Sequence, residues 1–377
     1  MKTKDTISSF VLSLDYLFNV IKSCGIALIL IVFDIHAVFA ADANSRLEIL
    51  RNEIELEKVD TIRARLMGEL AWELKFVDSK RALELAEKEI QIGRENQNNL
   101  LLADGFRVKA LTLVIQEKIL DGMSNYDSSI FFAKKAMSNY YEISCYNLIG
   151  GMYNDHGDYD KSIEFYRKGL NLAQQSKDGK LISVLSNNIA ETYQSSNRHT
   201  ELVERYFKLA LDNSKKNKNW PIAGMNAANL AFEYSKLGQK RKAEIVLNEA
   251  IELMNRNPSK SYQYGTTCHV LSSVYLELGD MKNSIHYAKI SMEIMDSLQQ
   301  PDNVLRPLIN LANAYLSIRD ISNAQFYAER LLNGAKKRNA KLFISEGYRI
   351  LSSISELKGT HAQSLDFYKL YKIYNDS

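Results

Sequence analysis

The chain has 377 residues, of which 46% are hydrophobic and 25% are charged, a composition typical of a globular protein with enough apolar material for a large core. Its 48 lysines and arginines nearly balance its 45 aspartates and glutamates, and the net charge of +3 excludes the concentrated basic excess of most nucleic-acid-binding domains. With only four prolines and 17 glycines, the chain favours helices over a turn-rich β architecture.

Residues 1–40 have the pattern of a secretory signal peptide. Lys2 and Lys4 begin the segment, and an apolar run from Cys24 to Ala40 ends in small residues suited to cleavage before Ala41. The run is shorter than the roughly 20 apolar residues that span a membrane, and a charged residue interrupts it. We therefore expect a cleaved signal and a periplasmic or otherwise exported protein. An uncleaved anchor is the alternative, and it would be the only membrane contact.

Two looser helical units are expected in residues 41–143, around Ser79–Ile90 and around Tyr126–Met137. Two cysteines, Cys145 and Cys268, remain after residue 40. They fall in well-separated segments, whereas a disulfide requires Cα atoms within roughly 7 Å. We expect both to be buried as small hydrophobic residues.

Residues 144–377 contain a regular repeat. Tyrosines in similar surroundings recur every 40 or 41 residues, at Tyr153, Tyr193, Tyr234, Tyr275 and Tyr315. Three residues before each lies a small residue: Gly150, Ala190, Ala231, Ser272 or Ala312. Four residues after each comes a break, at Gly157, Asn197, Gly238, Gly279 and Arg319, with Gly359 in a sixth unit. Small residues allow two helices to approach closely, a tyrosine fills the remaining wedge, and glycine tolerates the left-handed conformation that ends a helix.

This order of small residues, aromatic residues and turns resembles the tetratricopeptide repeat family. The best matches to its pattern are residues 147–170 and 229–251, and the resemblance covers residues 144–377 as six units. The unit is longer than the basic 34 residues, which predicts longer helices. The resemblance implies an all-α superhelical solenoid that binds a protein or peptide ligand and needs no cofactor.

Units of 40 residues behind a secretion signal also resemble the sensor regions of regulatory proteins from the Bacteroidetes group of bacteria. That resemblance implies an exported sensor or scaffold of a signalling system. The alternative is a cytoplasmic regulator similar to peptide-sensing transcription factors, in which residues 1–40 would be a structural segment. The apolar, continuous run of residues 24–40 argues against a helix-turn-helix there.

The stretch Asp155-His156-Gly157-Asp158 gathers two carboxylates and an imidazole, the residue types of a metal or acid-base site. It occupies the turn position of one repeat, and these acids and the histidine do not recur together in the turns of the other units. We therefore interpret it as a turn between two helices. The sequence also lacks HExxH, GxxxxGK[ST], GxGxxG and CxxC motifs, so we predict no enzyme.

The concave face of such a solenoid is expected to be lined by the first helix of each unit, where asparagines recur. A carboxamide both donates and accepts hydrogen bonds, so it can hold the backbone of an extended peptide. In peptide-binding members of the family, asparagines of this helix do so. The predicted groove residues are Asn147, Asn188, Asn229, Asn310 and Asn313, with His269, Tyr348 and Arg349 as neighbours that could add specificity. The alternative is that the asparagines only bond neighbouring helices to each other.

The last expected helix carries apolar residues with no following helix to cover them: Leu370, Tyr371, Ile373 and Tyr374. Solenoid stacks normally end in a helix with a polar outer face. We therefore predict a terminal docking surface for self-association or for a partner. No nucleic-acid partner is expected.

Overall fold

The computed structural model describes residues 46–196, 200–256, 261–298 and 303–375, which form helices and connecting turns without a strand. The predicted signal peptide lies outside these ranges. A short helix at 46–56 precedes the labelled ones. These are α2 (Asp60–Leu74), α3 (Ser79–Glu95), α4 (Asn99–Ile115), α5 (Ile119–Lys135), α6 (Asn139–Asp155), α7 (Tyr159–Gln175), α8 (Gly179–Ser195), α9 (Thr200–Lys216), α10 (Trp220–Lys236), α11 (Lys240–Asn255), α12 (Tyr262–Leu278), α13 (Met281–Ser297), α14 (Leu305–Ser317), α15 (Ile321–Lys337), α16 (Lys341–Leu357) and α17 (His361–Asn375). None of them is long and apolar enough to cross a membrane.

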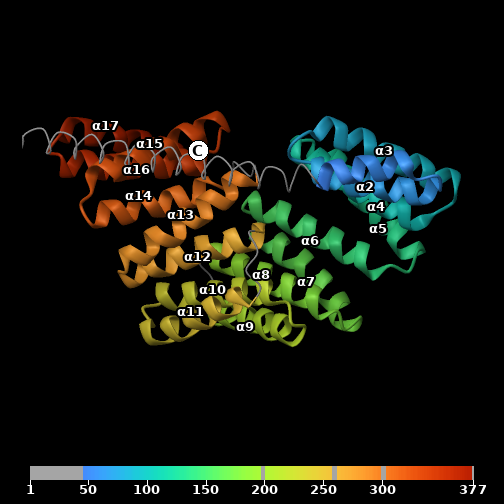
Figure 1. Ribbon diagram of the computed structural model, residues 1–377, viewed down its shortest axis with the longest axis horizontal. Helices are drawn as coiled ribbons and strands as arrows, with labels where there is room; N and C mark the ends of the chain where they lie inside the picture. Colours follow the sequence, from blue (N-terminus) through green and yellow to red (C-terminus); the bar gives the residue numbers. More distant parts are fainter. Residues whose placement is uncertain (1–45, 197–199, 257–260, 299–302, 376–377) are drawn as a thin grey trace, which may run out of the picture.

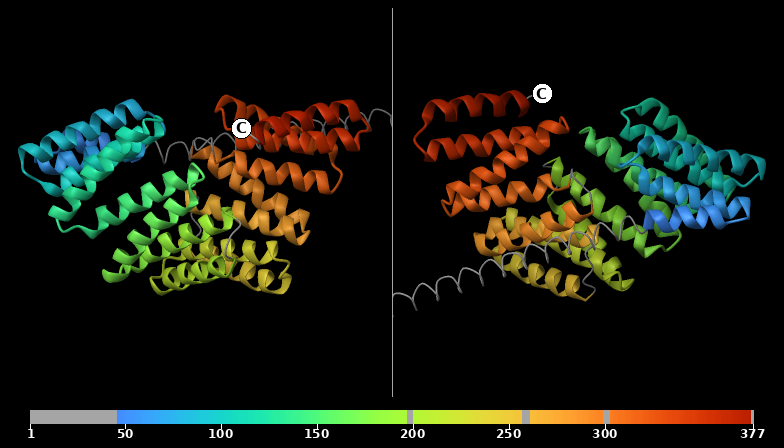
Figure 2. Two further views of the ribbon diagram at one scale, coloured as in Figure 1. Left: turned by 180° about the vertical axis from the view of Figure 1, so that it is seen from behind. Right: turned by 45° about the horizontal axis from the view of Figure 1, so that its top comes forward.

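Consecutive helices pair as hairpins, from α2 with α3 to α16 with α17. Figures 1 and 2 show the hairpins following one another along an arc, from α2–α5 at one end through α8–α11 to α14–α17 at the other. Successive first helices contact each other in most units, as α4 and α6 do, whereas successive second helices of the described chain make at most isolated contacts. Helices on the inside of a curve are closer together, so the first helices line the concave face, as the repeat predicts.

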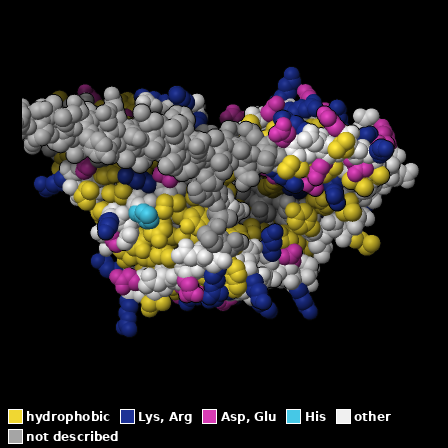
Figure 3. All heavy atoms as spheres, in the orientation of Figure 1, with side chains coloured by type: hydrophobic (Ala, Val, Ile, Leu, Met, Phe, Trp, Pro, Cys, Tyr) yellow, Lys and Arg dark blue, Asp and Glu magenta, His cyan; other side chains and the backbone are white. Residues whose placement is uncertain are grey.

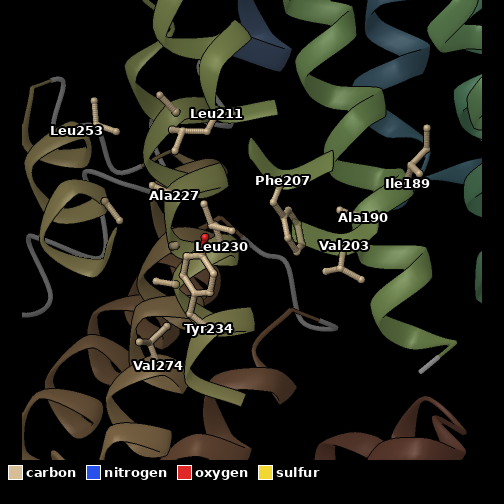
Figure 4. Packing of buried hydrophobic residues seen from close by; sticks show 14 of the residues in the cluster. Ile189, Ala190, Val203, Phe207, Leu211, Ala227, Leu230, Tyr234, Leu253 and Val274 are labelled. Carbon is tan, nitrogen blue, oxygen red and sulfur yellow. The ribbon is translucent and has the colours of Figure 1, made fainter. Parts of the chain in front are cut away.

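The repeated small residues and tyrosines build the core as the sequence predicts. Ala190 and Ala231 are fully buried, and hydrophobic residues of α8 to α12 pack into one continuous cluster (Figure 4). Tyr275 stacks on Tyr287 of the paired helix with ring centroids 5.6 Å apart, and Tyr315 stacks on Tyr327 at 5.5 Å. Such aromatic pairs add stability beyond the area that they bury. The tyrosine therefore joins the two helices of its own unit.

The predicted turns are confirmed. The breaks have positive φ values in Gly157 (75°), Gly238 (69°), Gly279 (86°), Gly359 (74°) and Arg319 (60°), while Asn197 lies outside the described residues. The acid after the break caps the next helix: Asp158 Oδ1 accepts a hydrogen bond from the backbone N–H of Lys161. A carboxylate at this position satisfies an N–H that the helix leaves free and suits the helix dipole.

Both predicted lone cysteines are buried and unbridged. The Cys145 thiol approaches the Ser129 hydroxyl at 3.1 Å, and burial raises the thiol pKa to about 11. The pKa of Cys268 is raised to about 12 by the same cause. Because the thiolate is the reactive form, burial keeps these side chains inert.

Candidate functional site

The predicted groove asparagines lie between the first helices of successive units, where their amide groups form hydrogen bonds from helix to helix. Asn188 Nδ2 donates to Asn147 Oδ1 at 2.7 Å, which joins α8 to α6. Asn310 Nδ2 donates to Ser273 Oγ at 2.8 Å and to the carbonyl of His269 at 3.3 Å, which joins α14 to α12. The asparagines therefore hold successive helices of the concave layer together, the alternative role considered from the sequence.

The predicted groove asparagines differ from one another in how accessible they are to a ligand. Asn229 and Asn310 are only 8% and 7% exposed, whereas Asn147, Asn188 and Asn313 are half-buried. Asn313 Oδ1 accepts a hydrogen bond from Arg349 Nη2 at 3.3 Å, and Arg349 is itself half-buried. The accessible asparagines of the predicted groove therefore lie in α6, α8 and α14, and Arg349 of α16 lies beside Asn313.

Tyr348 does not belong to the groove, contrary to the prediction. It is 6% exposed, and its ring stacks on Tyr374 of α17 with centroids 5.9 Å apart and lies 6.0 Å from Phe367. Tyr348 and Arg349 are consecutive on one helix, so they point about 100° apart around its axis. Arg349 faces the concave layer, and Tyr348 consequently faces the second helix of its unit.

Glu191 of α8 is a groove residue that the sequence analysis missed. Its Oε1 accepts hydrogen bonds from Asn187 Nδ2 and from Asn229 Nδ2, both at 2.9 Å. Burial raises the Glu191 pKa, although the side chain is exposed to solvent. The two facts agree if the carboxylate faces the hollow of the arc, where water reaches it and protein surrounds it. The spacing of Asn187 and Glu191, one helical turn apart on one face, is the signal that could have identified it.

Arg306, at the start of α14, is a second missed residue. It is exposed and makes no ion pair with any described residue. Its positive charge acts on three groups from other helices, because it lowers the pKa of Asp155, Glu191 and His269. Side chains from α6, α8 and α12 therefore lie within electrostatic range of Arg306 on α14.

Asp155, Glu191, His269 and Arg306 lie at positions that move progressively towards the start of the helix from one unit to a later one, which we call the diagonal. Asp155 lies two residues after the repeat tyrosine of its unit, and Glu191 lies two residues before it. His269 and Arg306 lie six and nine residues before theirs. The offset changes by about one helical turn from α6 to α8 and slightly less from α12 to α14, whereas from α8 to α12 one turn is spread over two units.

His269 is neutral in this setting. Burial, and then the charge of the nearby Arg306, lower its pKa to about 3. Its Nδ1 lies 3.4 Å from Asn310 Nδ2. For Asp155, burial raises the pKa, while His156 and Arg306 oppose this. Among the described residues, Arg306 therefore lies within electrostatic range of two carboxylates, Asp155 and Glu191, whose ionised forms are disfavoured by burial.

The stretch Asp155-His156-Gly157-Asp158 forms the predicted turn. His156 Nδ1 lies 2.8 Å from the carbonyl oxygen of Met152 at the end of α6, and Asp158 caps α7. Across residues 46–196, 200–256, 261–298 and 303–375, no three His, Cys, Asp or Glu side chains are grouped as for a metal ion. On the face shown in Figure 3, basic side chains are spread out and interspersed with acidic ones.

In the predicted terminal surface, Leu370, Tyr371 and Tyr374 are partly buried against the core that α16 shares with α17. Ile373 is 61% exposed, and Leu365 and Tyr368 of the same helix are also exposed. An apolar face on α17 therefore exists, and docking through it remains a prediction.

Comparisons with known proteins find a family model that matches two segments of the chain. A tetratricopeptide repeat model matches residues 143–176, which hold α6 and α7, and residues 227–255, within α10 and α11. A search of curated proteins found no significant match. The fold and the hairpin packing define an α-helical repeat solenoid. Two segments of the chain are therefore similar to tetratricopeptide repeats, and the described helices have the solenoid fold of such repeats.

Solved structures show the same fold at low sequence identity. The apo form of RapI matches with a TM-score of 0.59 at 12% identity, over 91% of this chain and 98% of that one. The apo form of the quorum sensor NprR from B. thuringiensis gives 0.58 at 14% identity, over 91% and 97%. NprR in complex with its cognate peptide NprX gives 0.50 at 15% identity, over 89% and 88%.

Proposed function

We propose that the protein is a non-catalytic solenoid that binds a protein or peptide ligand on its concave face. The observation that carries the proposal is the row of half-buried asparagines on the first helices, Asn147, Asn188 and Asn313. Asp155 and Arg306, on two of the same helices, are exposed and make no ion pair with a described residue. The similarity to NprR, solved with a peptide, supports a peptide as the ligand.

The concave face suits an extended segment. Half-buried Asn147, Asn188 and Asn313 offer carboxamides that can both donate to and accept from a peptide backbone. These side chains are already fixed by hydrogen bonds between helices, as in the 2.7 Å contact of Asn188 with Asn147. A groove that is ordered before binding loses less conformational entropy when the ligand arrives.

Photo-crosslinking in cells tests this proposal. A photoreactive residue at Asn313, on the concave face, should capture a defined peptide or protein, identified by mass spectrometry. The matched probe at Ile245, exposed on the outer helix α11, should not capture it. Equal capture at both positions, or capture at Ile245 alone, would contradict binding in the groove.

We further propose that the protein acts outside the cytoplasm as a sensor or scaffold of a signalling system. The sequence pattern of residues 1–40 supports this. The alternative, a cytoplasmic peptide-sensing regulator, is favoured by the similarity to a quorum sensor. Cell fractionation with N-terminal sequencing separates the two: an exported chain that begins at Ala41 supports the first, and a cytoplasmic chain that retains residue 1 supports the second.

A further inference from the structure

The outer face of the solenoid carries a groove between the second helices α13 and α15, which make at most isolated contacts with each other. The groove has a volume of about 440 Å³, which is within the range of ligand sites. Its floor is apolar and buried, and consists of Val304, Leu305 and Leu308. One wall is a single face of α15, with the spacing of neighbours on a helix: Phe326, Glu329, Arg330, Asn333, Gly334 and Lys337. Asp296 of α13 and Arg338 complete the lining.

The lining of this groove has more cations than carboxylates, and both of its carboxylates already accept from other side chains. Asp296 Oδ2 forms an ion pair with Arg330 Nη2 at 2.8 Å, and Glu329 Oε1 accepts a hydrogen bond from Gln325 Nε2 at 2.7 Å. Lys337 is exposed and makes no hydrogen bond or ion pair with a described residue. The groove therefore keeps a net positive charge, and Lys337 is a cation without a partner in the described chain.

Three other grooves along the second helices are electrically balanced. Each is lined by two cations and two carboxylates: Arg94, Lys109, Glu87 and Glu95 in the first, Arg167, Lys168, Asp160 and Glu164 in the second, and Lys215, Arg256, Glu249 and Glu252 in the third. The positive charge of the α13–α15 groove is therefore not a general property of the outer face.

The groove between α9 and α11 shows how the same position is neutralised two units earlier. Counted from the repeat tyrosine of each unit, Lys337 corresponds to Arg256. Arg256 Nη2 pairs with Glu252 Oε1 at 2.7 Å, and its guanidinium lies 4.7 Å from the centre of the Trp220 ring. Asn333 stands at the position that corresponds to Glu252, so α15 offers Lys337 no carboxylate there.

The apolar and cationic ends of the α15 wall are well separated. Phe326 is 57% exposed, and it lies eleven positions before Lys337, which is about 16 Å along a helix. An extended peptide rises about 3.3 Å per residue, so about five residues bridge this distance. A ligand that uses both ends therefore has an apolar group and an anionic group, separated by a short extended segment.

We propose that the α13–α15 groove is a second binding site, which takes an acidic segment of a partner protein extended along α15. A carboxylate of the segment pairs with Lys337, and an apolar side chain near its other end covers Phe326. The middle of the groove favours a peptide over a fatty acid. An aliphatic chain would lie on the ion pair of Arg330 with Asp296, whereas a peptide backbone can exchange hydrogen bonds with the exposed Asn333 carboxamide.

Fluorescence anisotropy with the full-length protein and labelled synthetic hexapeptides tests this site. The probe peptide has blocked ends, a phenylalanine at the start, two glutamates at the end and neutral residues between them. One control peptide replaces the glutamates with glutamine, and the other replaces the phenylalanine with serine. We expect the probe to bind about tenfold more tightly than either control, which corresponds to about 1.4 kcal/mol.

Variants place the binding in this groove. Lys337→Gln should weaken binding of the probe about tenfold and leave the glutamine control peptide unaffected. Lys337→Glu should reverse the preference, so that a peptide with lysines in place of the glutamates binds more tightly than the probe. Arg256→Gln, at the corresponding position two units earlier, is the matched control and should leave binding of the probe unchanged.

Two results would overturn the proposal on the side of the protein. Equal affinity for the probe and the glutamine control peptide would contradict recognition of a carboxylate. Equal losses in Lys337→Gln and Arg256→Gln would contradict binding in this groove. Decanoate and inorganic phosphate are tested in the same way, and Lys337-dependent binding of either one without binding of the probe would assign the groove to a small anion. The site lies outside the concave face, so these results do not depend on the crosslinking at Asn313.

Discussion

The two ends of the solenoid are built from the same hairpins but have different cores. In α6 to α17, small residues and stacked aromatic rings fill the space between helices, as in the pair Tyr275 and Tyr287. In α2 to α5, charged side chains enter the core: Glu89 is fully buried, and Asp104 and Arg107 are nearly so. The comparison shows that a repeat fold can continue through units that add buried charges to their apolar core.

The charged cluster of the first units is only partly compensated. Arg107 Nε donates to Asp104 Oδ1 at 3.1 Å, and its guanidinium lies over the Trp72 ring at 4.3 Å. Glu89 has no hydrogen-bond partner for either carboxyl oxygen within the described chain, and a Cβ at Gly68 would lie 2.3 Å from its Oε2. The N-terminal units therefore combine an apolar core with a buried charged cluster, whereas the core clusters of the regular units are mainly apolar.

The largest effect should come from breaking the buried ion pair. Arg107→Ala leaves Asp104 buried without its cation, and we expect a loss of about 3–5 kcal/mol in the free energy of unfolding, measured by urea denaturation. Arg167→Ala is the control in the regular region. Arg167 is exposed and donates to the Tyr193 hydroxyl at 2.8 Å, so its loss should cost about 1 kcal/mol or less. Equal losses would show that the two regions do not differ as described.

The close packing of the regular units is tested by two neighbouring glycines. A Cβ at Gly150 would lie 2.6 Å from the Tyr166 ring, so Gly150→Ala should destabilise by about 1–3 kcal/mol through overpacking. A Cβ at Gly151 would lie 3.6 Å from its nearest neighbour, the Tyr166 hydroxyl oxygen, which is an ordinary contact. Gly151→Ala should therefore stabilise α6 by roughly 0.5–1 kcal/mol through helix propensity. Thermal melting of both variants checks that the two substitutions change stability in opposite directions. Destabilisation of the same size in both would contradict the account.

The turns between helices should give a smaller effect. Gly157 has φ of 75° and nothing near its Cβ position, so Gly157→Val should cost about 1–2 kcal/mol from backbone strain alone. Arg319 has φ of 60° at the equivalent position, so Arg319→Gly should be neutral or slightly stabilising. Chemical denaturation measures both. An unchanged Gly157→Val protein would refute the turn assignment.

The smallest effect concerns protonation in the N-terminal units. Burial first, and then the charge of Asp104, raise the Glu89 pKa well above its ordinary value. The folded state therefore binds a proton more tightly than the unfolded state, so this group's contribution to stability is complete at acid pH and falls as pH rises above about 4.5. Glu89→Gln should remove that dependence, so that the variant gains stability relative to the unmodified protein at pH 8 and gains less or none at pH 5. Denaturation at both pH values checks this, and parallel curves for the two proteins would contradict it.

The fold could be predicted from local chemistry that repeats. Each tyrosine, small residue and turn residue acts within its own hairpin or against the adjacent helix, so the spacing of 40 or 41 residues was sufficient to place Tyr193, Ala190 and Gly157 correctly. Tyr348 was misplaced because its orientation depends on which face of α16 receives α17, a tertiary property.

The groove chemistry was harder to predict for a physical reason. Asp155, Glu191 and Arg306 stand at different positions in their units, and only the superhelical rotation brings Asp155 and Glu191 within electrostatic range of Arg306. A search for residues that recur at the same position in every unit finds the asparagines. It overlooks Asp155, Glu191 and Arg306, because their positions differ from unit to unit. The buried cluster around Glu89 could not be predicted for a similar reason, because its members come from units in which the sequence repeat is weak.

The central claim is that a ligand binds to the concave layer. Hydrogen–deuterium exchange of the full-length protein, with and without the ligand captured by the probe at Asn313, tests it most directly. The account predicts slower exchange in α8, α12 and α14, which carry Glu191, His269 and Arg306, and little change in α17. Protection confined to α17, with unchanged exchange in those first helices, would contradict the account and would identify the terminal apolar face as the binding surface.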